Sequence, residues 1–188
     1  MAKSPIQEAG SAVRLVVVSN YEQLQHAFAI RSICFMEDTG LSVKRAFDGN
    51  DFQATHIVAY AKDEPIGATR IRWFRDFAKI ERTGFRKAYR SAQVLKQCSA
   101  FVFDHAARKG YTQVLTVARR DFAGVWIRVL GFRELAHRAI VREGEPFLTL
   151  VKNLTAPQQA ISIETDSNVL MRIEGAWDVA TPFEGESR

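Results

Sequence analysis

The sequence predicts an α/β fold in which helices flank a mixed, mostly antiparallel central sheet. Three observations predict it. Short β-branched and apolar runs recur along the chain, longer segments between them carry apolar residues at helical spacing, and neighbouring runs are joined by short turns. The expected order of elements is β-α-β-β-β-α-β-α-β-β. A chain of 188 residues is long enough for one domain with a substantial core.

The first strand and the first helix lie near the N-terminus. Residues 13–19 form the continuous apolar run VRLVVVS, which predicts a strand buried on at least one face. Asn20 can cap a helix, and apolar residues recur at roughly helical spacing through residues 21–38. These apolar residues are Leu24, Phe28, Ile30, Ile33 and Phe35. The polar segment 38–53 contains two glycines and predicts a loop with a helical turn.

Three strands are expected next. Residues 55–61 (THIVAYA) and 66–74 (IGATRIRWF) flank the turn sequence KDEP, which predicts a β-hairpin. Residues 77–85 (FAKIERTGF) predict a third strand that extends this sheet.

A long amphipathic helix is expected over residues 91–109. Its apolar residues are spaced for one buried face, and Gly110 follows at the position where helices commonly end. Residues 112–118 (TQVLTVA) then predict another strand.

The last elements of the domain are a short helix and two strands. Residues 121–132 predict a helix that is capped by Asp121 and stopped at Gly131. Residues 132–141 and 145–154 predict the closing strands.

The composition is that of an ordinary soluble protein, with 47% apolar and 25% charged residues. The chain has no run of about 18 apolar residues and its first residues lack the apolar core of a signal peptide, so we expect a cytoplasmic protein without a membrane partner. The cysteine and histidine spacing resembles no metal site.

Basic residues are concentrated between positions 82 and 96. This stretch holds five of them and no acid after Glu81. They are Arg82, Arg86, Lys87, Arg90 and Lys96. Such a cluster suits an anionic ligand or an acidic partner protein, and the alternative is a solvated basic face. No nucleic-acid-binding motif accompanies the charge, so we expect no nucleic acid partner.

Four stretches of the sequence carry a family resemblance, and they follow one another within residues 13–154. They are AIRSICFMEDTG, THIVAYAKDEPIGATRIR, YRSAQVLKQCSAFVFDHAARKGY and WIRVLGF. Together they resemble the GNAT superfamily of acyl-CoA-dependent acyltransferases. The resemblance implies a GNAT-like fold and an N-acyltransferase. It also implies that acetyl-CoA or another acyl-CoA is the donor substrate, and that a small-molecule or protein amine attacks it in a ternary complex.

The resemblance also implies roles for residues 81–96. Glu81 would be the general base, acting directly or through water. A backbone amide between Thr83 and Phe85 would stabilise the oxyanion and guide the pantetheine. The start of the next helix would bind the CoA pyrophosphate, because its first amides are unpaired and its dipole favours negative charge. The residues expected to bind the donor are Thr83, Gly84, Phe85, Arg90, Ser91, Ala92, Gln93, Val94, Leu95 and Lys96.

Two departures from the family pattern affect this expectation. The glycine positions of the phosphate loop hold Gln93 and Leu95, whose side chains add bulk unless they point away from the ligand. Ile127 stands where many members carry a tyrosine as general acid, and isoleucine cannot donate a proton. Another group would then protonate the thiolate, or none is needed, because a thiolate leaves tolerably well unaided. The candidate groups are Tyr89, Tyr111, Ser91 and water.

The candidate bases have structural alternatives. Glu81 could instead be an ion-pair partner of Arg70 or Arg82, because strand carboxylates often pair with cross-strand arginines. His56 and His137 are alternative bases, although a structural or surface role suits each of them better.

Other noticeable residues are expected to serve the fold. His105 is expected to face solvent from the outer part of its helix. Trp73 and Trp126 are expected in the core, where either could also line an acyl pocket. Cys34 and Cys98 are expected as buried free thiols in a reducing compartment.

Two further functions remain open at this stage. The first is an enzyme that resembles autoinducer and N-acyl amino acid synthases and takes a longer acyl group from acyl carrier protein. Seven residues fall in an order loosely like theirs: Arg31, Phe35, Asp48, Asp51, Arg70, Glu81 and Arg82. The second is a non-catalytic ligand-binding module on the same scaffold.

The sequence also predicts how the chain is divided. Residues 11–154 are expected to form the GNAT-like domain, and residues 155–188 an extension that packs on the domain or on a neighbouring subunit. A homodimer is a family-level expectation, and the extension is compatible with it.

Overall fold

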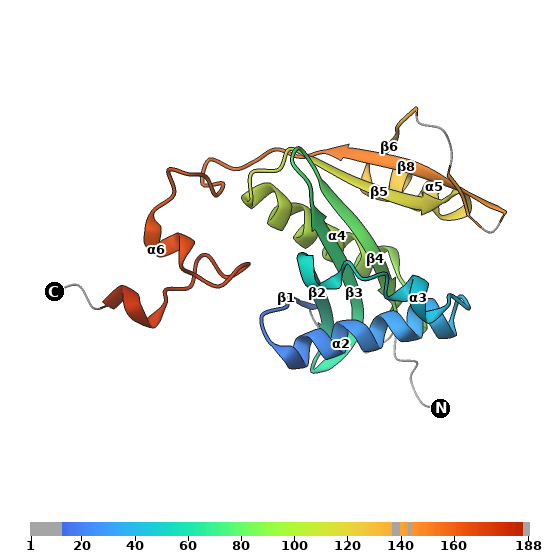
Figure 1. The fold of residues 1–188 in the computed structure, drawn as a ribbon, viewed down its shortest axis with the longest axis horizontal. Coiled ribbons are helices and arrows are strands. Elements are labelled where there is room, and N and C mark those ends of the chain that lie inside the picture. The colour runs from blue at the N-terminus through green and yellow to red at the C-terminus, as the bar shows by residue number, and fades with distance from the viewer. Residues whose placement is uncertain (1–12, 137–139, 143, 186–188) are drawn as a thin grey trace.

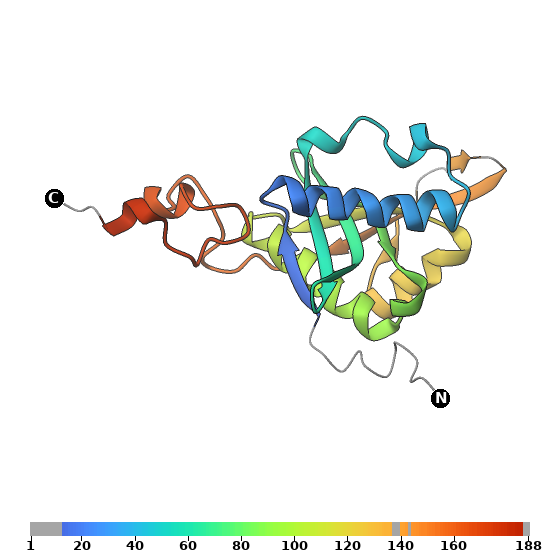
Figure 2. The same ribbon diagram turned by 90° about the horizontal axis from the view of Figure 1, so that it is seen from below.

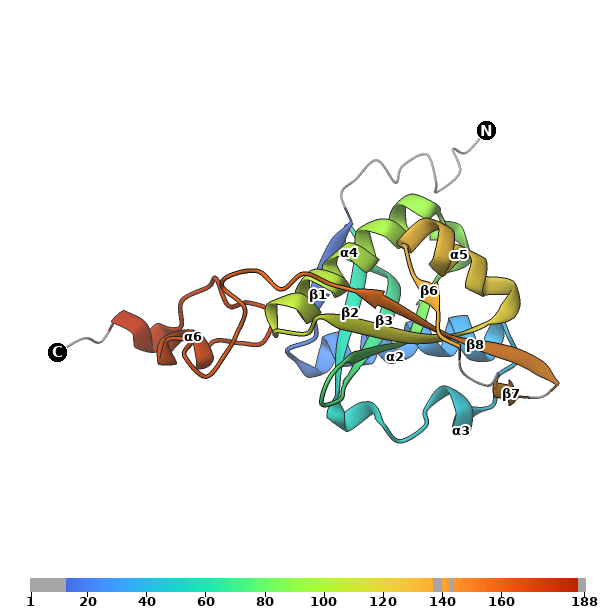
Figure 3. The same cartoon turned by 90° about the horizontal axis from the view of Figure 1, so that it is seen from above.

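The computed structural model of this chain describes residues 13–136, 140–142 and 144–185. Its centre is one eight-stranded sheet with helices on both faces (Figures 1 and 3). In the part of the chain that the structure describes, no helix is long and apolar enough to cross a bilayer. The predicted α/β fold with a mixed, mostly antiparallel sheet is confirmed.

The strands lie in the order β1-β2-β3-β4-β5-β8-β6, and β7 also pairs with β8. Every described pair is antiparallel except β4 with β5. The bounds are Arg14–Val17 (β1), Ala54–Ala61 (β2), Glu64–Trp73 (β3), Ala78–Phe85 (β4), Gln113–Arg119 (β5), Arg133–Glu134 (β6), Ile140–Arg142 (β7) and Glu145–Asn153 (β8).

Three long helices cover the two faces of the sheet. Helix α2 (Tyr21–Arg31) packs on one face, and α4 (Ala92–Arg108) with α5 (Arg120–Leu130) covers the other. Side chains alternate between these faces along each strand. In β2, Val58 belongs to the cluster under α2, and its neighbour Ile57 belongs to the main core under α4 and α5.

The connection between α2 and β2 is built from short helical segments, as the prediction of a loop with a helical turn required. They are a π-helical turn (Ser32–Glu37), α3 (Val43–Ala46) and a 3₁₀ turn (Asp51–Gln53). Figure 2 shows this connection running alongside α2 on the outside of the molecule.

The helix ends confirm most of the predicted caps. Asn20 accepts the amide of Gln23 at 2.9 Å at the start of α2, and Gly131 ends α5 in the left-handed region at φ 73°. The cap predicted at Asp121 is wrong. Arg119 is the N-cap of α5, and Asp121 lies in its first turn, where the helix dipole favours a carboxylate.

The single strand predicted over residues 132–141 is also wrong, because two short strands replace it. β6 pairs with the C-terminal half of β8, and β7 pairs with the first residues of β8. Residues 137–139, which include His137, lie outside the described residues.

The C-terminal segment 155–185 projects beyond the end of the domain where α4 finishes (Figures 1 and 2). It contains α6 (Ser167–Leu170) and a 3₁₀ turn (Pro182–Gly185). Its Trp177 stacks on His105, with ring centroids 5.1 Å apart, and Glu174 accepts a hydrogen bond from His105 Nε2 at 3.1 Å. The prediction that His105 faces solvent is therefore wrong. This segment covers it and leaves it only 4% exposed.

Candidate active site

Strands β4 and β5 run side by side over only part of their length. Their parallel register ends at the pair Ile80–Thr116, after which β5 continues with β8 as its partner. β4 continues to Phe85 without β5 beside it. The backbone of residues 81–85 therefore has one side outside the sheet ladder, where it is available to a ligand.

A β-bulge interrupts β4 at this point. Opposite Thr69 of β3, β4 places two residues, Arg82 and Thr83, where a regular ladder places one. Arg82 takes a left-handed φ of 53°, which is uncommon for a residue other than glycine. The hydroxyl groups of Thr69 and Thr83 lie 2.6 Å apart across the bulge. Because a bulge leaves its extra residue unpaired, it supplies the kind of free backbone amide that an oxyanion needs.

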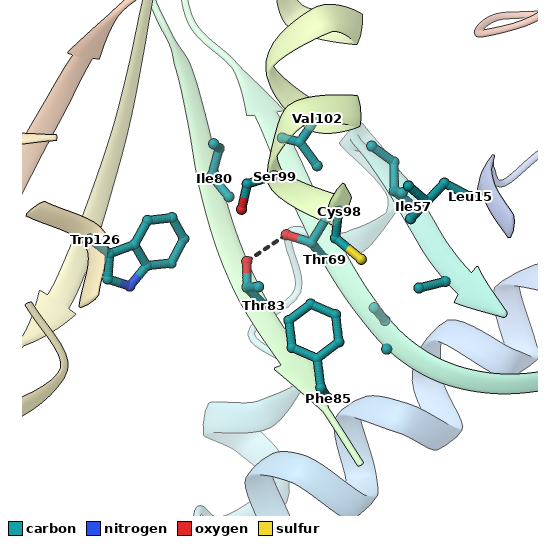
Figure 4. Close-up of a pocket in the computed structure, with 13 residues that line it drawn as sticks. Leu15, Ile57, Thr69, Ile80, Thr83, Phe85, Cys98, Ser99, Val102 and Trp126 are labelled. Carbon is teal, nitrogen blue, oxygen red and sulfur yellow. Dashed lines mark hydrogen bonds between the residues drawn. The ribbon is translucent and has the colours of Figure 1, made fainter. Parts of the chain in front are cut away.

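The bulge also decides which side chains face which side of the sheet. Ile80 faces α4, and Glu81 lies on the opposite face, where it contacts Arg70. In an unbroken strand, residues 83 and 85 would share the face of Glu81. Instead, Thr83 and Phe85 point into a pocket beneath α4 (Figure 4).

This pocket is small and mostly apolar. Its cavity volume is about 20 Å³, enough for about one water-sized group. Thr69, Thr83, Ser99 and Trp126 face it together with aliphatic side chains from β2, β3, β4 and α4 (Figure 4). Cys98 also lines it, and burial raises the pKa of that thiol to about 12. Trp126, expected in the core or at an acyl pocket, packs against the main core and closes one side of this pocket.

Two glycines let the chain pass close to bulky neighbours here. A Cβ on Gly67 would lie 2.2 Å from the ring of Phe85, and a Cβ on Gly84 would lie 2.8 Å from the Cβ of Cys34. Neither position tolerates a side chain without displacing its neighbour. Gly84 therefore sits directly against α2's π-helical extension, and Phe85 is free to cover β3.

The first turn of α4 remains open to an anion although its glycines are missing. Ser91 is the N-cap, and its Oγ accepts the amide of Val94 at 3.1 Å. Leu95 turns inward and packs against the main core, so its bulk points away from the helix start. Gln93 is exposed and has room to move. Ser91, Ala92, Gln93 and Lys96 are exposed, and Val94 is buried.

Two of the basic residues near this helix are already paired with one carboxylate of the same chain. Asp38 binds the Arg90 guanidinium, and Lys87 Nζ lies 3.0 Å from Asp38 Oδ1. Arg90 Nε also donates to the carbonyl oxygen of Phe85 at 2.7 Å. Hydrogen bonds from Lys87 and, more weakly, Arg90 lower the pKa of Asp38. A phosphate that binds these cations must therefore compete with Asp38.

Glu81 is held by two cations on the opposite face of the sheet. Arg70 Nη2 donates to Glu81 Oε2 at 2.5 Å, and Lys79 Nζ lies 2.5 Å from Glu81 Oε1. Burial opposes ionisation of Glu81, but the hydrogen bonds from Lys79 and Arg70 win and lower its pKa. A carboxylate with a lowered pKa is a weaker base. This geometry favours the ion-pair alternative, and the general-base role of Glu81 stays a prediction.

Six of the seven residues ordered like those of the carrier-protein enzymes meet in one ion-pair network. Asp48 binds Arg70 at 2.7 Å and Arg82 at 3.0 Å, and Asp51 binds both Arg70 and Arg31. Arg31 and Arg70 are at most 1% exposed. The seventh residue, Phe35, packs beside the cluster under α2 instead. The network fastens the α2–β2 connection to strands β3 and β4.

The remaining acid and base candidates are dispersed. Tyr111 stacks on Trp73 at the far end of α4 from Ser91, with centroids 5.0 Å apart. His56 is buried beside Asp51 on the face of the sheet opposite to the pocket beneath α4. Ser91 uses its hydroxyl group as the helix cap. Of the two tyrosines predicted as acids, Tyr89 lies next to the predicted phosphate loop and packs near Phe85.

Solved structures share the fold of this chain. A Lactobacillus plantarum structure, provisionally named an N-acetyltransferase, matches with a TM-score of 0.70 at 24% identity, over 77% of this chain and 99% of that one. A GNAT family acetyltransferase from Elizabethkingia anophelis with acetyl-CoA bound matches with a TM-score of 0.58 at 14% identity, over 76% of this chain and 98% of that one. At these identities the likeness concerns the fold.

Sequence relatives decide the family. The Bacillus subtilis protein YjcF, named as an uncharacterised N-acetyltransferase, is 27% identical over 141 residues, 75% of this chain and the whole of YjcF. A second B. subtilis protein, provisionally named an acetyltransferase, is 33% identical over 138 residues, 72% of this chain and 92% of that protein. The chain belongs to the GNAT superfamily of acetyltransferases. No protein-family model matches it.

This membership confirms the enzyme class expected from the four motifs. The relatives do not favour the carrier-protein enzyme or the non-catalytic module. In this GNAT acetyltransferase, sequence reasoning missed Asp38, Thr69 and Ser99 as neighbours of the residues predicted to bind the donor. No local signal could have found Asp38, because it meets Arg90 across 52 positions of the chain. The bulge opposite Thr69 has no sequence signature here either, since its left-handed residue is an arginine.

Proposed function

We propose that this enzyme transfers an acetyl group from acetyl-CoA to an amine by direct attack in a ternary complex. The observation that carries the proposal is the parting of β4 and β5 beside a bulged segment, with a small apolar pocket under α4. Solved GNAT relatives bind acetyl-CoA or CoA with the same fold. Residues 83–85 would guide the pantetheine and present an amide to the thioester oxygen.

The size of the pocket supports acetyl as the transferred group. A cavity of about 20 Å³ has room for a methyl-sized group and little more. An apolar tunnel for a long chain is much larger than a cavity of this size. A long acyl chain, as the carrier-protein enzymes use, would need such a tunnel.

The donor's phosphates would bind at the start of α4. The first-turn amides that Ser91 does not cap would provide the site together with the helix dipole, and the turning of Leu95 toward the core keeps the approach open. Arg90 and Lys87 would contribute once a phosphate competes with Asp38. The donor-binding roles of residues 83–85 and 90–96 belong to this proposal.

In the reaction, the lone pair of the amine forms a C–N bond to the thioester carbonyl carbon. The C–S bond then breaks, CoA leaves as a thiolate, and the proton released by the nitrogen ends on that thiolate through water. Positioning supplies much of the acceleration in such a step. Burial raises the pKa of both Cys34 and Cys98, so neither thiol is a ready nucleophile, which supports direct attack.

Calorimetric titration with acetyl-CoA, CoA and a long-chain acyl-CoA, followed by thiol release with a panel of amines, tests the proposal. We expect acetyl-CoA and CoA to bind with similar affinity and initial-rate lines to intersect. Binding of the long-chain donor alone would contradict the acetyl assignment. Parallel rate lines with an acylated cysteine would contradict the ternary complex, and binding without turnover of any amine would indicate a non-catalytic module.

A further inference from the structure

Ser99 is a polar residue on the inward face of α4, between apolar neighbours. Leu95, four residues earlier, packs against the main core, and Val102, three residues later, belongs to it. Ser99 itself is 6% exposed and lines the small pocket beneath the helix. A buried hydroxyl group normally has a hydrogen-bond partner, because leaving it unpaired costs free energy.

The hydroxyl group of Ser99 has no such partner among the described residues. A serine inside a helix often donates to the carbonyl oxygen four residues earlier, as Ser32 does to Phe28 at 3.1 Å. Ser99 does not use the carbonyl oxygen of Leu95 in this way. Figure 4 shows its oxygen pointing toward Thr83, inside the pocket. The fold therefore directs an unused hydrogen-bond donor into this pocket.

The oxygen of Ser99 is also open to a ligand. Some unpaired side-chain atoms of this protein have almost no accessible surface. Among the described residues these are Arg31 Nε, His56 Nδ1, Arg70 Nε and Thr181 Oγ1. Ser99 Oγ is not one of them, so a group that enters the pocket can reach it.

The two threonine hydroxyl groups of the pocket have already used their hydrogens. Thr69 Oγ1 donates to the carbonyl oxygen of Glu81 at 3.3 Å. At the 2.6 Å contact between the two threonines, Thr83 is therefore the donor, because a hydroxyl group carries one hydrogen. A ligand atom that accepts a hydrogen bond must find its donor elsewhere in the lining.

Two other donors line the pocket but suit such a ligand less well. A thiol is a weak donor, and Figure 4 shows the sulfur of Cys98 pointing away from Thr83. The indole N–H of Trp126 lies on the edge of its ring that is turned away from Ser99 (Figure 4). The hydroxyl group of Ser99 is thus the strong donor that points toward Thr83.

We propose that Ser99 donates a hydrogen bond to the carbonyl oxygen of the donor thioester and stabilises the negative charge that develops there during attack. This inference rests on the proposed acetyl transfer. The bulged segment of β4 would supply a backbone amide to the same oxygen, and oxyanion sites often combine backbone amides with side-chain hydroxyl groups. The hydroxyl group keeps its proton throughout, and the charge passes to sulfur when the C–S bond breaks.

The position of Ser99 along α4 suits this role. It lies eight residues after the cap Ser91, which is about 12 Å along the helix. With the phosphates at the helix start, the pantetheine arm would run from Ser91 toward Ser99 and carry the thioester at its far end. The acetyl group then brings one acceptor, its carbonyl oxygen, for Ser99, and a methyl group for the aliphatic lining.

Infrared difference spectra of bound acetyl-CoA with an isotope-labelled carbonyl carbon test the inference without any amine. A hydrogen bond lowers the C=O stretching frequency, so the frequency should be lower in wild type than in Ser99→Ala. Gln97→Ala, on the exposed side of the same helix, should match wild type. The same frequency in wild type and Ser99→Ala would overturn the inference and leave acetyl transfer standing. A wild-type protein that binds no acetyl-CoA would overturn both.

Kinetics and stability separate this role from a structural one. Ser99→Ala should lower kcat and kcat/KM together by about 100-fold with little change in the Kd of acetyl-CoA, because the bond strengthens in the transition state. Its thermal midpoint should equal or exceed that of wild type, because the lost hydroxyl group had no partner. Ser99→Cys, a weaker donor of similar size, should have intermediate activity. An unchanged kcat in Ser99→Ala, or a parallel fall of activity and thermal midpoint, would overturn the proposal.

Discussion

Arg70 and Glu81 stand directly opposite each other on β3 and β4, and Arg70 Nη2 donates to Glu81 Oε2 at 2.5 Å. Arg70 is fully buried, and Glu81 is 12% exposed. A buried guanidinium keeps its charge, so it requires carboxylates around it. The pair therefore links the strand that carries the bulge to the connection that carries Asp48 and Asp51.

The substitution Glu81→Gln should destabilise the protein by about 2 kcal/mol, because it removes one of the three carboxylates around buried Arg70. Activity should fall in parallel with the folded fraction. Denaturant unfolding measures the loss, and exposed Asp76→Asn is the matched control, expected within about 0.5 kcal/mol of wild type. Full stability with turnover about 100-fold lower would instead establish Glu81 as the general base.

At position 82, a glycine should destabilise the protein less than an alanine. The φ of 53° at this position is easy for glycine and strained for alanine, while both changes remove the hydrogen bond of Arg82 to the carbonyl oxygen of Arg45 at 2.6 Å. We expect the free energy of unfolding of Arg82→Ala to be about 1 kcal/mol lower than that of Arg82→Gly. Denaturant midpoints of the two variants check this. Equal midpoints would mean that the bulge relaxes when the side chain is lost.

Asp38→Asn should tighten CoA binding by about 3- to 10-fold, because it releases Arg90 and Lys87 for the phosphates. Arg90→Ala should weaken binding. Asp178→Asn is the control for net charge, since it releases Arg108 at the other end of α4. Titration at two salt concentrations checks the effect, which should shrink at high salt. An Asp38→Asn protein with unchanged affinity would show that the phosphates do not use these cations.

Trp126→Ala should widen the proposed acyl pocket and relax the proposed preference for acetyl-CoA. Removing the indole side chain opens space beside Thr83 and Ser99, so turnover with butyryl-CoA relative to acetyl-CoA should rise about 10-fold. Val125→Ala, on the exposed side of the same helix, should leave the ratio unchanged. Competing-donor assays measure the ratio. An unchanged ratio in the Trp126→Ala enzyme would mean that the acyl group binds outside this pocket.

Glu174 should contribute a measurable part of the acid sensitivity of this protein. Hydrogen bonding from His105, with the charge of Lys109, lowers the pKa of Glu174 from 4.5 to about 2. Folding depresses the pKa of such a carboxylate. The ionised carboxylate stabilises the folded state at every pH above its pKa in the unfolded chain, and this contribution is lost as the pH falls toward its pKa in the folded protein. The window for Glu174 therefore runs from about pH 4.5 down to about pH 2.

The variant Glu174→Gln isolates this contribution. Its unfolding free energy should be lower than wild type at pH 7, and the difference should vanish as the pH approaches 2. Unfolding curves of both proteins at half-unit pH steps measure this difference in unfolding free energy. The contributions of the other acidic groups are the same in both proteins and cancel when the two are subtracted. A difference that stays constant between pH 5 and pH 2 would mean that Glu174 titrates normally in the folded protein.

Most secondary structure was predictable because its signals are local. The apolar run at 13–19, the helical spacing through α4, and the cap at Asn20 each depend on neighbours a few positions away. The motifs of the donor loop are local too, so the superfamily was recognisable although its glycines are absent. Cap placement failed at Asp121, where adjacent residues compete for the same turn.

Local signals determined the elements, their order and the superfamily, whereas only the tertiary structure decided which side chains meet. The bulge at Arg82 reversed the alternation of β4 and sent Thr83 and Phe85 under α4. Folding also brought Asp38 to Arg90 and Trp177 to His105. The physical reason is that side-chain period and capping act within a few residues. Strand register and burial, in contrast, depend on how segments far apart in the sequence compete for one core.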